Sequence, residues 1–374
     1  MLLQHVIHLF IVHVSCTAIG HTSNITSIHN RPISTLSHPA AVQLEPKAPL
    51  TVQDVTTEQP GPHEILIKNE LVALNPIDAK ITKLAIFPIP YPAIHGSSYG
   101  GTVAAVGSEV TGFKVGDKVA AVKTGGANGN KYSAFQKQVV SRDVTAIKVP
   151  SSVDLHTPVG LLGNFSTIVG LFNEHLGLDR PDPAKKLPSK GKKILVYGGT
   201  SSFGSFATQY VSQSGYDAVT TTSPQHKDFI AKLGAVHVVD HTQSQDAVIK
   251  ELVAQGPYEY VVDSISLKPT FAITTAVLAA QGGGKVYALL PPTDPESVPK
   301  EVTVSFGSWS APLAEEKNAG LLKWSFETYF AQAIAANKII GLPSQKIDGG
   351  LDGLNKAVDV LFKGVSGLKV VVEP

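Results

Sequence analysis

The stretch Lys193–Gly204 reads KILVYGGTSSFG and predicts the fold of the second half of the chain. Its short apolar run is typical of a buried strand, and the glycines that follow indicate a tight turn. The segment after Gly204 is expected to form a helix that ends at Gly215, because glycine is favoured just past a helix C-terminus. A strand, a glycine turn and a helix together predict a site for the pyrophosphate of a dinucleotide.

This glycine turn matches the G-x-G-x-x-G pattern only in part. Gly199 and Gly204 occupy the first and third glycine positions, and Ser201 replaces the second. A serine there still allows a fairly close approach of phosphate and adds a hydroxyl donor. An ordinary βα turn built from small residues stays open as the alternative at this point.

Composition indicates a globular chain with room for two domains. It has 374 residues, 43% of them hydrophobic and 16% charged, with a net charge of +1. A near-neutral balance gives no electrostatic argument for a nucleic-acid partner. The single cysteine, Cys16, excludes an internal disulfide and any zinc site that needs several thiolates.

Residues 1–39 differ in character from the rest. Met1–Ile19 is mostly apolar but is interrupted by histidines, so a transmembrane helix is not expected. A signal peptide, a disordered extension and a wrongly chosen start codon are the alternatives. Asn24 begins a glycosylation sequon, which matters only if the chain is secreted.

The remaining chain divides into a β-rich part and a part where strands and helices alternate. Residues 40–150 hold short strands between proline and glycine turns, which predicts a small, partly open β-barrel. Residues 153–178 are expected to be helical. From residue 193 the alternation predicts a doubly wound parallel sheet. Its strands are expected at 193–197, 218–222, 236–239, 258–262, 285–290 and 302–306, with helices at 226–233, 246–254 and 269–280.

Two amphipathic helices at 313–337 and 353–363 and a strand at 369–372 are expected to return to the first domain. The predicted organisation is therefore an α/β chain of four parts. These parts are an N-terminal extension (1–39), a β-barrel catalytic domain (40–165), a dinucleotide-binding domain (166–310) and a C-terminal return to the catalytic domain (311–374).

Several motifs in this order resemble the medium-chain dehydrogenase/reductases. They are LNPID at 74–78, GGTVAAVG at 100–107, GDKV at 116–119, LGA at 233–235 and SGLKVV at 366–371. The resemblance implies a GroES-like barrel followed by a Rossmann domain. The turn at 198–204 and the segment Ser223–His226 are most similar to the zinc-free fungal branch, which includes trans-acting enoyl reductases of polyketide pathways.

Departures from the zinc-dependent members are informative. Those members place a cysteine ligand where this chain has Asn75, and G-H-E where it has Gly96–Ser98. Their four-cysteine structural lobe is absent here. At Ser98 the zinc-free branch often has Asp. The resemblance therefore implies an enzyme without a metal, which transfers hydride to an activated C=C or to a quinone.

The end of the second predicted strand indicates the cofactor. NAD-dependent enzymes usually hold the ribose 2′-OH with a carboxylate at this place. Here the strand ends without an acid, and Ser223, Gln225, His226 and Lys227 follow. Hydroxyls and a cation suit a 2′-phosphate, so NADPH is the expected cofactor. The alternative is that Lys227 is only a solvated residue of a short helix and does not bind the 2′-phosphate.

Further site residues follow from the resemblance. Thr200, Ser201, Ser202 and Phe203 are expected along the pyrophosphate, and His241 beside the adenine. Leu289 and Leu290 are expected near the nicotinamide ribose, with Val365 and Ser366 closing over the cofactor. The complete cofactor set is Asn75, Asp78, Thr200, Ser201, Ser202, Phe203, Ser223, Gln225, His226, Lys227, His241, Leu289, Leu290, Val365 and Ser366.

Lys80, Ser166 and Thr167 match positions near the nicotinamide in the resembling enzymes and are the candidate catalytic residues. Lys80 could donate a proton to the enolate that hydride transfer leaves; Tyr99, Tyr132 or water are alternatives. The leading hypothesis is an NADPH-dependent reductase of enoyl or enone substrates, which resemblance connects with fungal secondary metabolism. A quinone reductase and a dinucleotide-binding protein without turnover are the alternatives.

The expected partner is a small-molecule substrate, with neither nucleic acid nor membrane. A monomer or homodimer is expected. A cytoplasmic location follows from the use of NADPH, with secretion as the alternative if residues 1–20 act as a signal.

Overall fold

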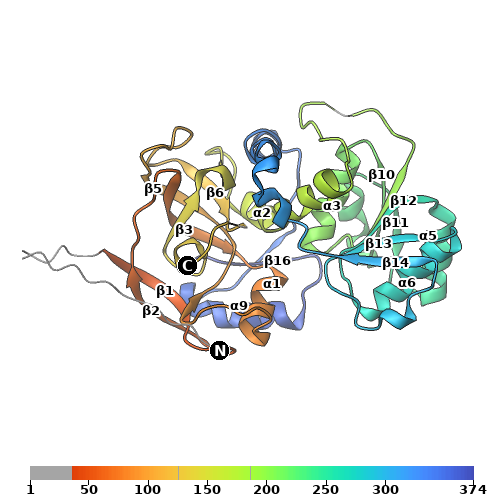
Figure 1. Cartoon of the computed structure of the whole chain (residues 1–374), viewed down its shortest axis with the longest axis horizontal. Helices are drawn as coiled ribbons and strands as arrows, with labels where there is room; N and C mark the ends of the chain where they lie inside the picture. The colour runs from red at the N-terminus through yellow and green to blue at the C-terminus, as the bar shows by residue number, and fades with distance from the viewer. Residues whose placement is uncertain (1–35, 125, 186) are drawn as a thin grey trace, which may run out of the picture. The chain divides into compact units, whose positions relative to one another are not determined.

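The computed structural model describes residues 36–124, 126–185 and 187–374. The predictions of a signal peptide and of glycosylation at Asn24 lie outside these residues. Two large sheets organise the described chain, one mixed and one parallel (Figure 1).

The first half of the chain and its last two strands build the barrel. Its seven-stranded sheet has the order β15-β16-β3-β5-β6-β8, and β7 also pairs with β3. These strands are β3 (Glu64–Ala73), β5 (Ser98–Val106), β6 (Lys118–Val122), β7 (Gln138–Arg142), β8 (Ala146–Lys148), β15 (Ser344–Lys346) and β16 (Lys369–Val372). A second sheet has the order β2-β1-β4, from β1 (Ser37–Gln43), β2 (Leu50–Thr56) and β4 (Ala93–Ile94). Because Val371 pairs with Ala73, the C-terminal strand becomes part of the barrel sheet.

The parallel sheet has the order β11-β10-β9-β12-β13-β14. Its strands are β9 (Lys193–Tyr197), β10 (Asp217–Thr222), β11 (Ala235–Asp240), β12 (Tyr258–Asp263), β13 (Gly284–Ala288) and β14 (Val302–Phe306). Counted from β9, this is the order 3-2-1-4-5-6, which confirms the predicted doubly wound fold. The strand order reverses between β9 and β12, where ligands bind in such sheets.

Both faces of the parallel sheet are buried, as the unbroken apolar sequence of β9 predicts. Ile194 and Val196 belong to one hydrophobic cluster, whereas Leu195 and Tyr197 belong to another. Alternate side chains of a strand point to opposite faces, so each face needs its own cover. Helices provide it: α3 (Ser202–Gln213), α4 (Lys227–Ala231), α5 (Gln245–Gln255) and α6 (Lys268–Ala280).

The other helices are α1 (Pro76–Leu84), α2 (His156–Val169), α7 (Ala319–Lys323), α8 (Ala331–Ala335) and α9 (Leu354–Lys363). A π-helical segment, Gly170–His175, continues α2, and another, Trp324–Phe330, joins α7 to α8. Short 3₁₀ turns occupy 130–132, 143–145, 224–226, 295–297, 311–314, 316–318 and 350–353. The expectation of one helix over 313–337 is wrong at its start, because Glu315 is extended (φ −77°, ψ 141°).

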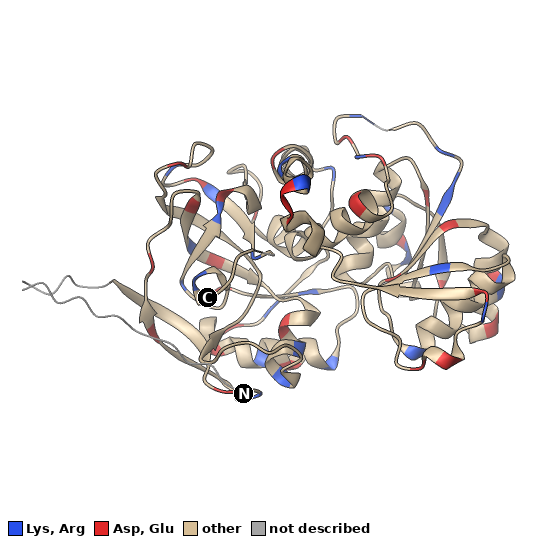
Figure 2. Cartoon of the chain, in the orientation of Figure 1, with Lys and Arg blue, Asp and Glu red and all other residues tan. Residues whose placement is uncertain are grey.

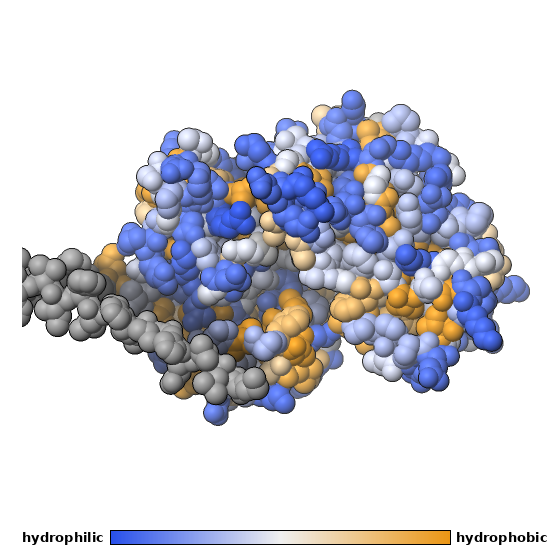
Figure 3. Space-filling view, in the orientation of Figure 1, coloured by the Kyte–Doolittle hydropathy of each residue, from blue (hydrophilic) through white to orange (hydrophobic). Residues whose placement is uncertain are grey.

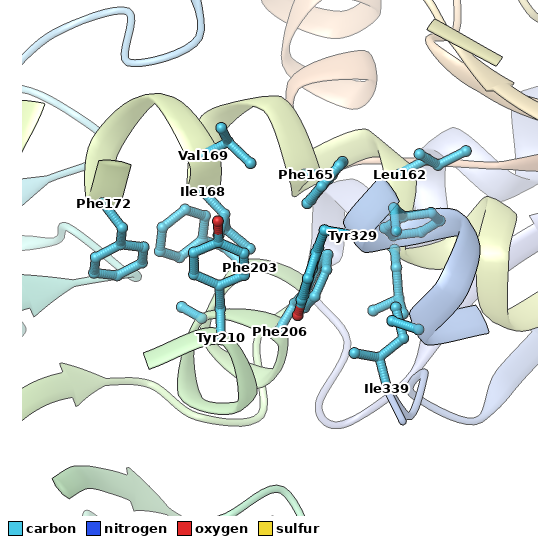
Figure 4. Packing of buried hydrophobic residues seen from close by; sticks show 14 of the residues in the cluster. Leu162, Phe165, Ile168, Val169, Phe172, Phe203, Phe206, Tyr210, Tyr329 and Ile339 are labelled. Carbon is cyan, nitrogen blue, oxygen red and sulfur yellow. The ribbon is translucent and has the colours of Figure 1, made fainter. Parts of the chain in front are cut away.

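An aromatic cluster joins α2 to α3 and to the C-terminal helices. The Phe165 ring lies 5.6 Å from Phe206, 4.7 Å from Phe330 and 5.9 Å from Tyr329, measured between centroids. Figure 4 shows the rings of Phe165, Phe206 and Tyr329 lying between the helices. The cluster therefore fixes α2 against α3, the helix that follows the glycine turn.

Lys and Arg residues are interspersed with Asp and Glu over the described elements, in keeping with the net charge of +1 (Figure 2). Across the part of the chain that the structure describes, no helix has the length and apolar character needed to cross a membrane. The three predicted boundaries between the four parts stay predictions; strand β1 begins at Ser37, within the predicted extension.

Candidate functional site

The glycine turn after β9 begins with a left-handed residue and ends in a capped helix. Gly198 has φ +88°, a conformation that side chains rarely allow. Ser201 Oγ accepts a hydrogen bond from Gly204 N at 2.9 Å and lies 2.9 Å from Ser264 Oγ. Ser201 therefore caps α3, which begins at Ser202 and so earlier than the sequence predicted.

Gly204 holds the helix close to the strand. A Cβ atom at this position would lie 2.2 Å from the Gly198 carbonyl oxygen, which is backbone and cannot move aside cheaply. The third glycine of the motif is thus required by the packing of α3 on β9.

The start of α3 fits an anionic group. Within the described residues, the backbone N–H groups of Ser202 and Phe203 have no hydrogen-bond acceptor. Thr222 Oγ1, at the end of the neighbouring β10, is buried and also lacks a partner there. Free donors at a helix N-terminus, beside the switch point of the sheet, suit a dinucleotide phosphate. Thr200 and Ser202 are half-buried here, and Phe203 is buried.

The end of β10 carries no carboxylate and meets the C-terminal segment. His226 Nε2 lies 3.3 Å from Ser366 Oγ and 3.2 Å from Gln225 Nε2. The imidazole also packs on Gly367, where an added Cβ would lie 2.7 Å from the ring. The structure thus brings together His226 and Ser366, two predicted cofactor-site residues that are 140 positions apart in the sequence.

Lys227 and His241 gather near one acid. Thr242 donates to Asp240 and is the main cause that lowers the pKa of that carboxyl, with smaller contributions from the charges of His241 and Lys227. Lys227 is exposed and makes no ion pair in the described ranges. A cationic group is therefore available beyond β10, next to the half-buried Ser223.

Asp263 and Ser266, which sequence reasoning missed, shape the end of β12. Asp263 Oδ1 accepts from the N–H groups of Ile265 (3.0 Å) and Ser266 (2.8 Å). Ser266 Oγ in turn accepts from Leu289 N at 2.8 Å, which ties the half-buried Leu289 to this loop. Burial raises the pKa of Asp263. An acid directly after a buried strand was the available signal.

Leu290 and Val365 are also half-buried, and Val365 packs against the barrel core. Neither has a recorded hydrogen bond to the turn after β9 in the described residues. Their predicted contact with a cofactor stays a prediction.

A second polar cluster lies on the face of the barrel sheet that α2 covers and comprises Asn75, Ser97, Ser98 and Lys369. Lys369 Nζ donates to Asn75 Oδ1 at 2.6 Å. Asn75 Nδ2 donates to Ser97 Oγ at 3.1 Å and to Ser98 Oγ at 3.0 Å. Asp78 Oδ2 accepts from Asn75 N at 2.7 Å and fixes the start of α1. Asn75 and Asp78 are therefore committed to protein contacts.

Lys369 is the residue of this cluster that the sequence did not reveal as functional. Burial lowers its pKa to about 8, and the Asp78 charge opposes this shift. Burial raises the pKa of Asp78 to about 6, opposed by the Asn75 N–H and by Lys369. Burial thus shifts both groups toward their neutral forms, and the attraction between the two charges opposes this shift. In the sequence, Lys369 stands in the SGLKVV motif at 366–371, but the motif alone gives it no role at the site.

The candidate catalytic residues lie on α1 and α2. Gly163 faces Asn75 and Ser98, where an added Cβ would lie 2.4 Å from their polar atoms. Ser166 and Thr167 follow one turn later on the same side of α2. Ser166 Oγ is buried and without a partner among the described residues. Burial lowers the pKa of Lys80, and no hydrogen bond joins it to Ser166 or Thr167 in the described ranges.

The two tyrosines considered as alternative donors are engaged elsewhere. Tyr99 is fully buried and donates to Val140 O at 3.2 Å. Tyr132 donates to Glu64, which Lys131 also contacts.

Zinc does not fit the Asn75 cluster. An ammonium group occupies the only amide oxygen of Asn75, and the cluster offers two serine hydroxyls as its remaining oxygens. Among residues 36–124, 126–185 and 187–374, no group of three or more His, Cys, Asp or Glu side chains could hold a metal ion.

Comparisons with known proteins identify the class. Residues 61–176 match the alcohol dehydrogenase GroES-like domain. An alcohol dehydrogenase superfamily protein from Novosphingobium aromaticivorans shares the fold, with a TM-score of 0.71 and 22% identity over 90% of this chain and 99% of that one. A quinone oxidoreductase from Pseudomonas syringae gives a TM-score of 0.68 and 21% identity over 90% and 99%. The barrel and the Rossmann sheet of this chain share that fold. A relative that is 33% identical over 83% of this chain shows that the chain belongs to the medium-chain dehydrogenase/reductase superfamily and is an oxidoreductase.

Curated relatives narrow this assignment. The trans-enoyl reductase himH of Aspergillus japonicus is 33% identical over 313 residues, covering 83% of this chain and 89% of himH. The trans-enoyl reductase tndF of Aspergillus flavipes is 29% identical over 90% of this chain and 98% of its own length. The chain therefore lies in the branch of the superfamily that resembles the fungal enoyl reductases.

Proposed function

We propose that this protein is a zinc-independent, NADPH-dependent reductase that adds hydride to the activated C=C of an enoyl or enone substrate. The observation that carries the choice of NADPH is the end of β10. It has no carboxylate for a ribose 2′-OH, but it has the hydroxyl of Ser223 and the free ammonium of Lys227. A charge-assisted hydrogen bond to a 2′-phosphate is favourable, whereas an acid would repel that phosphate.

The reaction class is supported by the relatives and by the Asn75 cluster. Two relatives named trans-enoyl reductase align along most of this chain. The positions of metal ligands in zinc-dependent enzymes hold a hydrogen-bonded amide and hydroxyls here. Such groups donate hydrogen bonds to a substrate oxygen but supply no Lewis acid.

Different residues would bind different parts of the cofactor. The N–H groups of Ser202 and Phe203 would hold the pyrophosphate, Lys227 the 2′-phosphate, and Leu289 the nicotinamide end. When bound, NADPH supplies the hydride. His226 and Ser366 together would position the C-terminal segment over the cofactor, because they are already in contact.

Lys80 is the proposed proton donor to the α-carbon. It lies on α1 between Ile77 and Leu84, which share its helix face and are 37% and 48% exposed. Figure 3 shows apolar surface over this region, and Phe87 just beyond α1 is 50% exposed. An apolar surrounding disfavours the ammonium form, which agrees with the lowered pKa of Lys80 and makes proton donation easier.

The test is a parallel fluorescence titration with NADPH and NADH, using the full chain and its Lys227→Ala variant. NADPH should bind at least about tenfold more tightly, a difference of roughly 1.4 kcal/mol. Lys227→Ala should remove most of that preference. Lys250→Ala, which changes an exposed lysine on α5, is the control and should keep it.

Other results would change the proposal. Equal binding of both cofactors would contradict the assignment of NADPH. Turnover of quinones but not of enones would make the protein a quinone reductase. Tight NADPH binding without turnover of either would favour a non-catalytic dinucleotide-binding protein. A cytoplasmic location and a small-molecule substrate, with a monomer or homodimer, complete the proposal.

A further inference from the structure

The Asn75 cluster has a hydrogen-bond direction that can be deduced from its members. The Lys369 ammonium can only donate, so the Asn75 atom that it contacts must be the amide oxygen. The amide nitrogen of Asn75 therefore faces the two serines. It carries two hydrogens, one for Ser97 Oγ and one for Ser98 Oγ. Both hydroxyl oxygens act as acceptors from Asn75, and each keeps its own hydrogen to donate.

The two serines differ in their exposure to solvent. Ser98, the first residue of β5, is fully buried, whereas Ser97, which precedes it, is only partly buried. Gly163 of α2 closes the other side of the cluster, because even a methyl group there would lie 2.4 Å from Asn75 and Ser98. Ser97 is therefore the member whose O–H can reach a bound molecule.

We propose that Ser97 donates its hydroxyl hydrogen to the carbonyl oxygen of the substrate, with Asn75 and Lys369 as positioning residues that keep it a donor. This inference rests on the proposed function. Hydride adds to the β-carbon, the C=C electron pair moves toward the carbonyl, and negative charge develops on that oxygen. NADPH is the reductant, and a proton then adds to the α-carbon.

The hydrogen bonds from Lys369 through Asn75 to Ser97 can stabilise the negative charge that develops on the carbonyl oxygen. A preorganised donor aimed at a developing oxyanion lowers the barrier more than it favours the ground state. The buried Lys369 ammonium polarises the Asn75 amide, which strengthens the donor at Ser97 in turn. The short contact of 2.6 Å between Lys369 Nζ and Asn75 Oδ1 agrees with this arrangement.

The first test compares kcat for an enone in Ser97→Ala and Ser97→Thr. Loss of the hydroxyl should lower kcat by about 10²- to 10³-fold. The threonine variant, which keeps a hydroxyl, should retain most of the wild-type kcat. Ser297→Ala, at an exposed turn, is the control and should leave kcat unchanged. The NADPH Kd should stay within about twofold in every variant, since Ser97 is proposed to contact the substrate and not the cofactor.

The second test addresses positioning. Asn75→Asp has nearly the same shape and retains the contact with Lys369, but it offers Ser97 an acceptor in place of a donor. The Ser97 hydrogen should then turn toward the new carboxylate, and kcat should fall nearly as far as in Ser97→Ala. The double variant, with Ser97→Ala and Asn75→Asp together, should have a kcat no lower than that of either single variant. If the two losses in kcat were additive, Asn75 would not act through Ser97, and the positioning role of Asn75 would be contradicted.

A readout without turnover completes the design. The infrared C=O stretch of a bound saturated ketone should shift to lower frequency in the wild type, and this shift should be lost in Ser97→Ala. A wild type that turns over enones while Ser97→Ala keeps its kcat and its C=O shift would overturn this inference alone. A wild type without any enone turnover would overturn the proposed function instead.

Discussion

At the scale of single residues, a buried histidine of the barrel makes the stability of the protein depend on pH. His95 is buried and donates from Nε2 to Gln43 Oε1 at 2.6 Å. The donor direction follows because Gln43 Nε2 is already used on Ala48 O and Thr82 O. His95 therefore carries a hydrogen on Nε2.

This histidine predicts a loss of stability in acid. Burial, with help from the Lys123 charge, lowers the pKa of His95 to about 4 from 6.5. Between these values the unfolded state binds the proton and the native state does not, so stability falls as pH falls from 6.5 to 4. The contribution is about 3 kcal/mol. Thermal unfolding of His95→Gln, which keeps an N–H donor, should show a correspondingly smaller loss over this range. Identical pH profiles of Tm would contradict the prediction.

At the scale of elements, the junction of β9 and α3 depends on close approach. Gly204→Ala would press a methyl group against the Gly198 carbonyl. We expect it to lower the free energy of unfolding by about 1–3 kcal/mol and to weaken NADPH binding, because α3 must move. Urea denaturation measures the first effect and fluorescence titration the second.

Gly320→Ala provides the matched control for this prediction. Gly320 lies in α7, and no atom is within 4 Å of an added Cβ there. Alanine should be neutral or stabilise by up to about 1 kcal/mol at such a helical site. If both variants unfolded at the same urea concentration, the packing explanation of Gly204 would fail.

Sequence periodicity predicted the strands of the parallel sheet well because β9 and its neighbours are apolar between clear turns. It failed over 313–318, where a buried Leu313 suggests a helix but Glu315 is extended. Local patterns also missed the role of Lys369, since its partner Asn75 is 294 residues away in sequence. Ser97 and Ser98 were noticed as departures from a motif, but only the fold shows that they share one amide.

At the scale of the whole molecule, the aromatic cluster around Phe165 connects the helix beside the Asn75 cluster to the helix after the glycine turn (Figure 4). Phe165→Ala should lower the free energy of unfolding by about 3–5 kcal/mol, because the side chain is fully buried among four other rings. Denaturant unfolding measures this change in the free energy of unfolding. Phe306→Ala is the control: the side chain is 49% exposed, and its loss should change stability by less than about 1 kcal/mol.

The central claim is that this chain transfers hydride from NADPH to the β-carbon of an activated C=C. The most direct measurement incubates the full chain with NADPH deuterated at C4, on either face in separate reactions, and an enone, followed by mass spectrometry and NMR of the product. The account predicts that one of the two labels appears at the β-carbon, with the α-hydrogen drawn from water. A reduced product without deuterium from either label, or no reduction of enones despite NADPH binding, would contradict it.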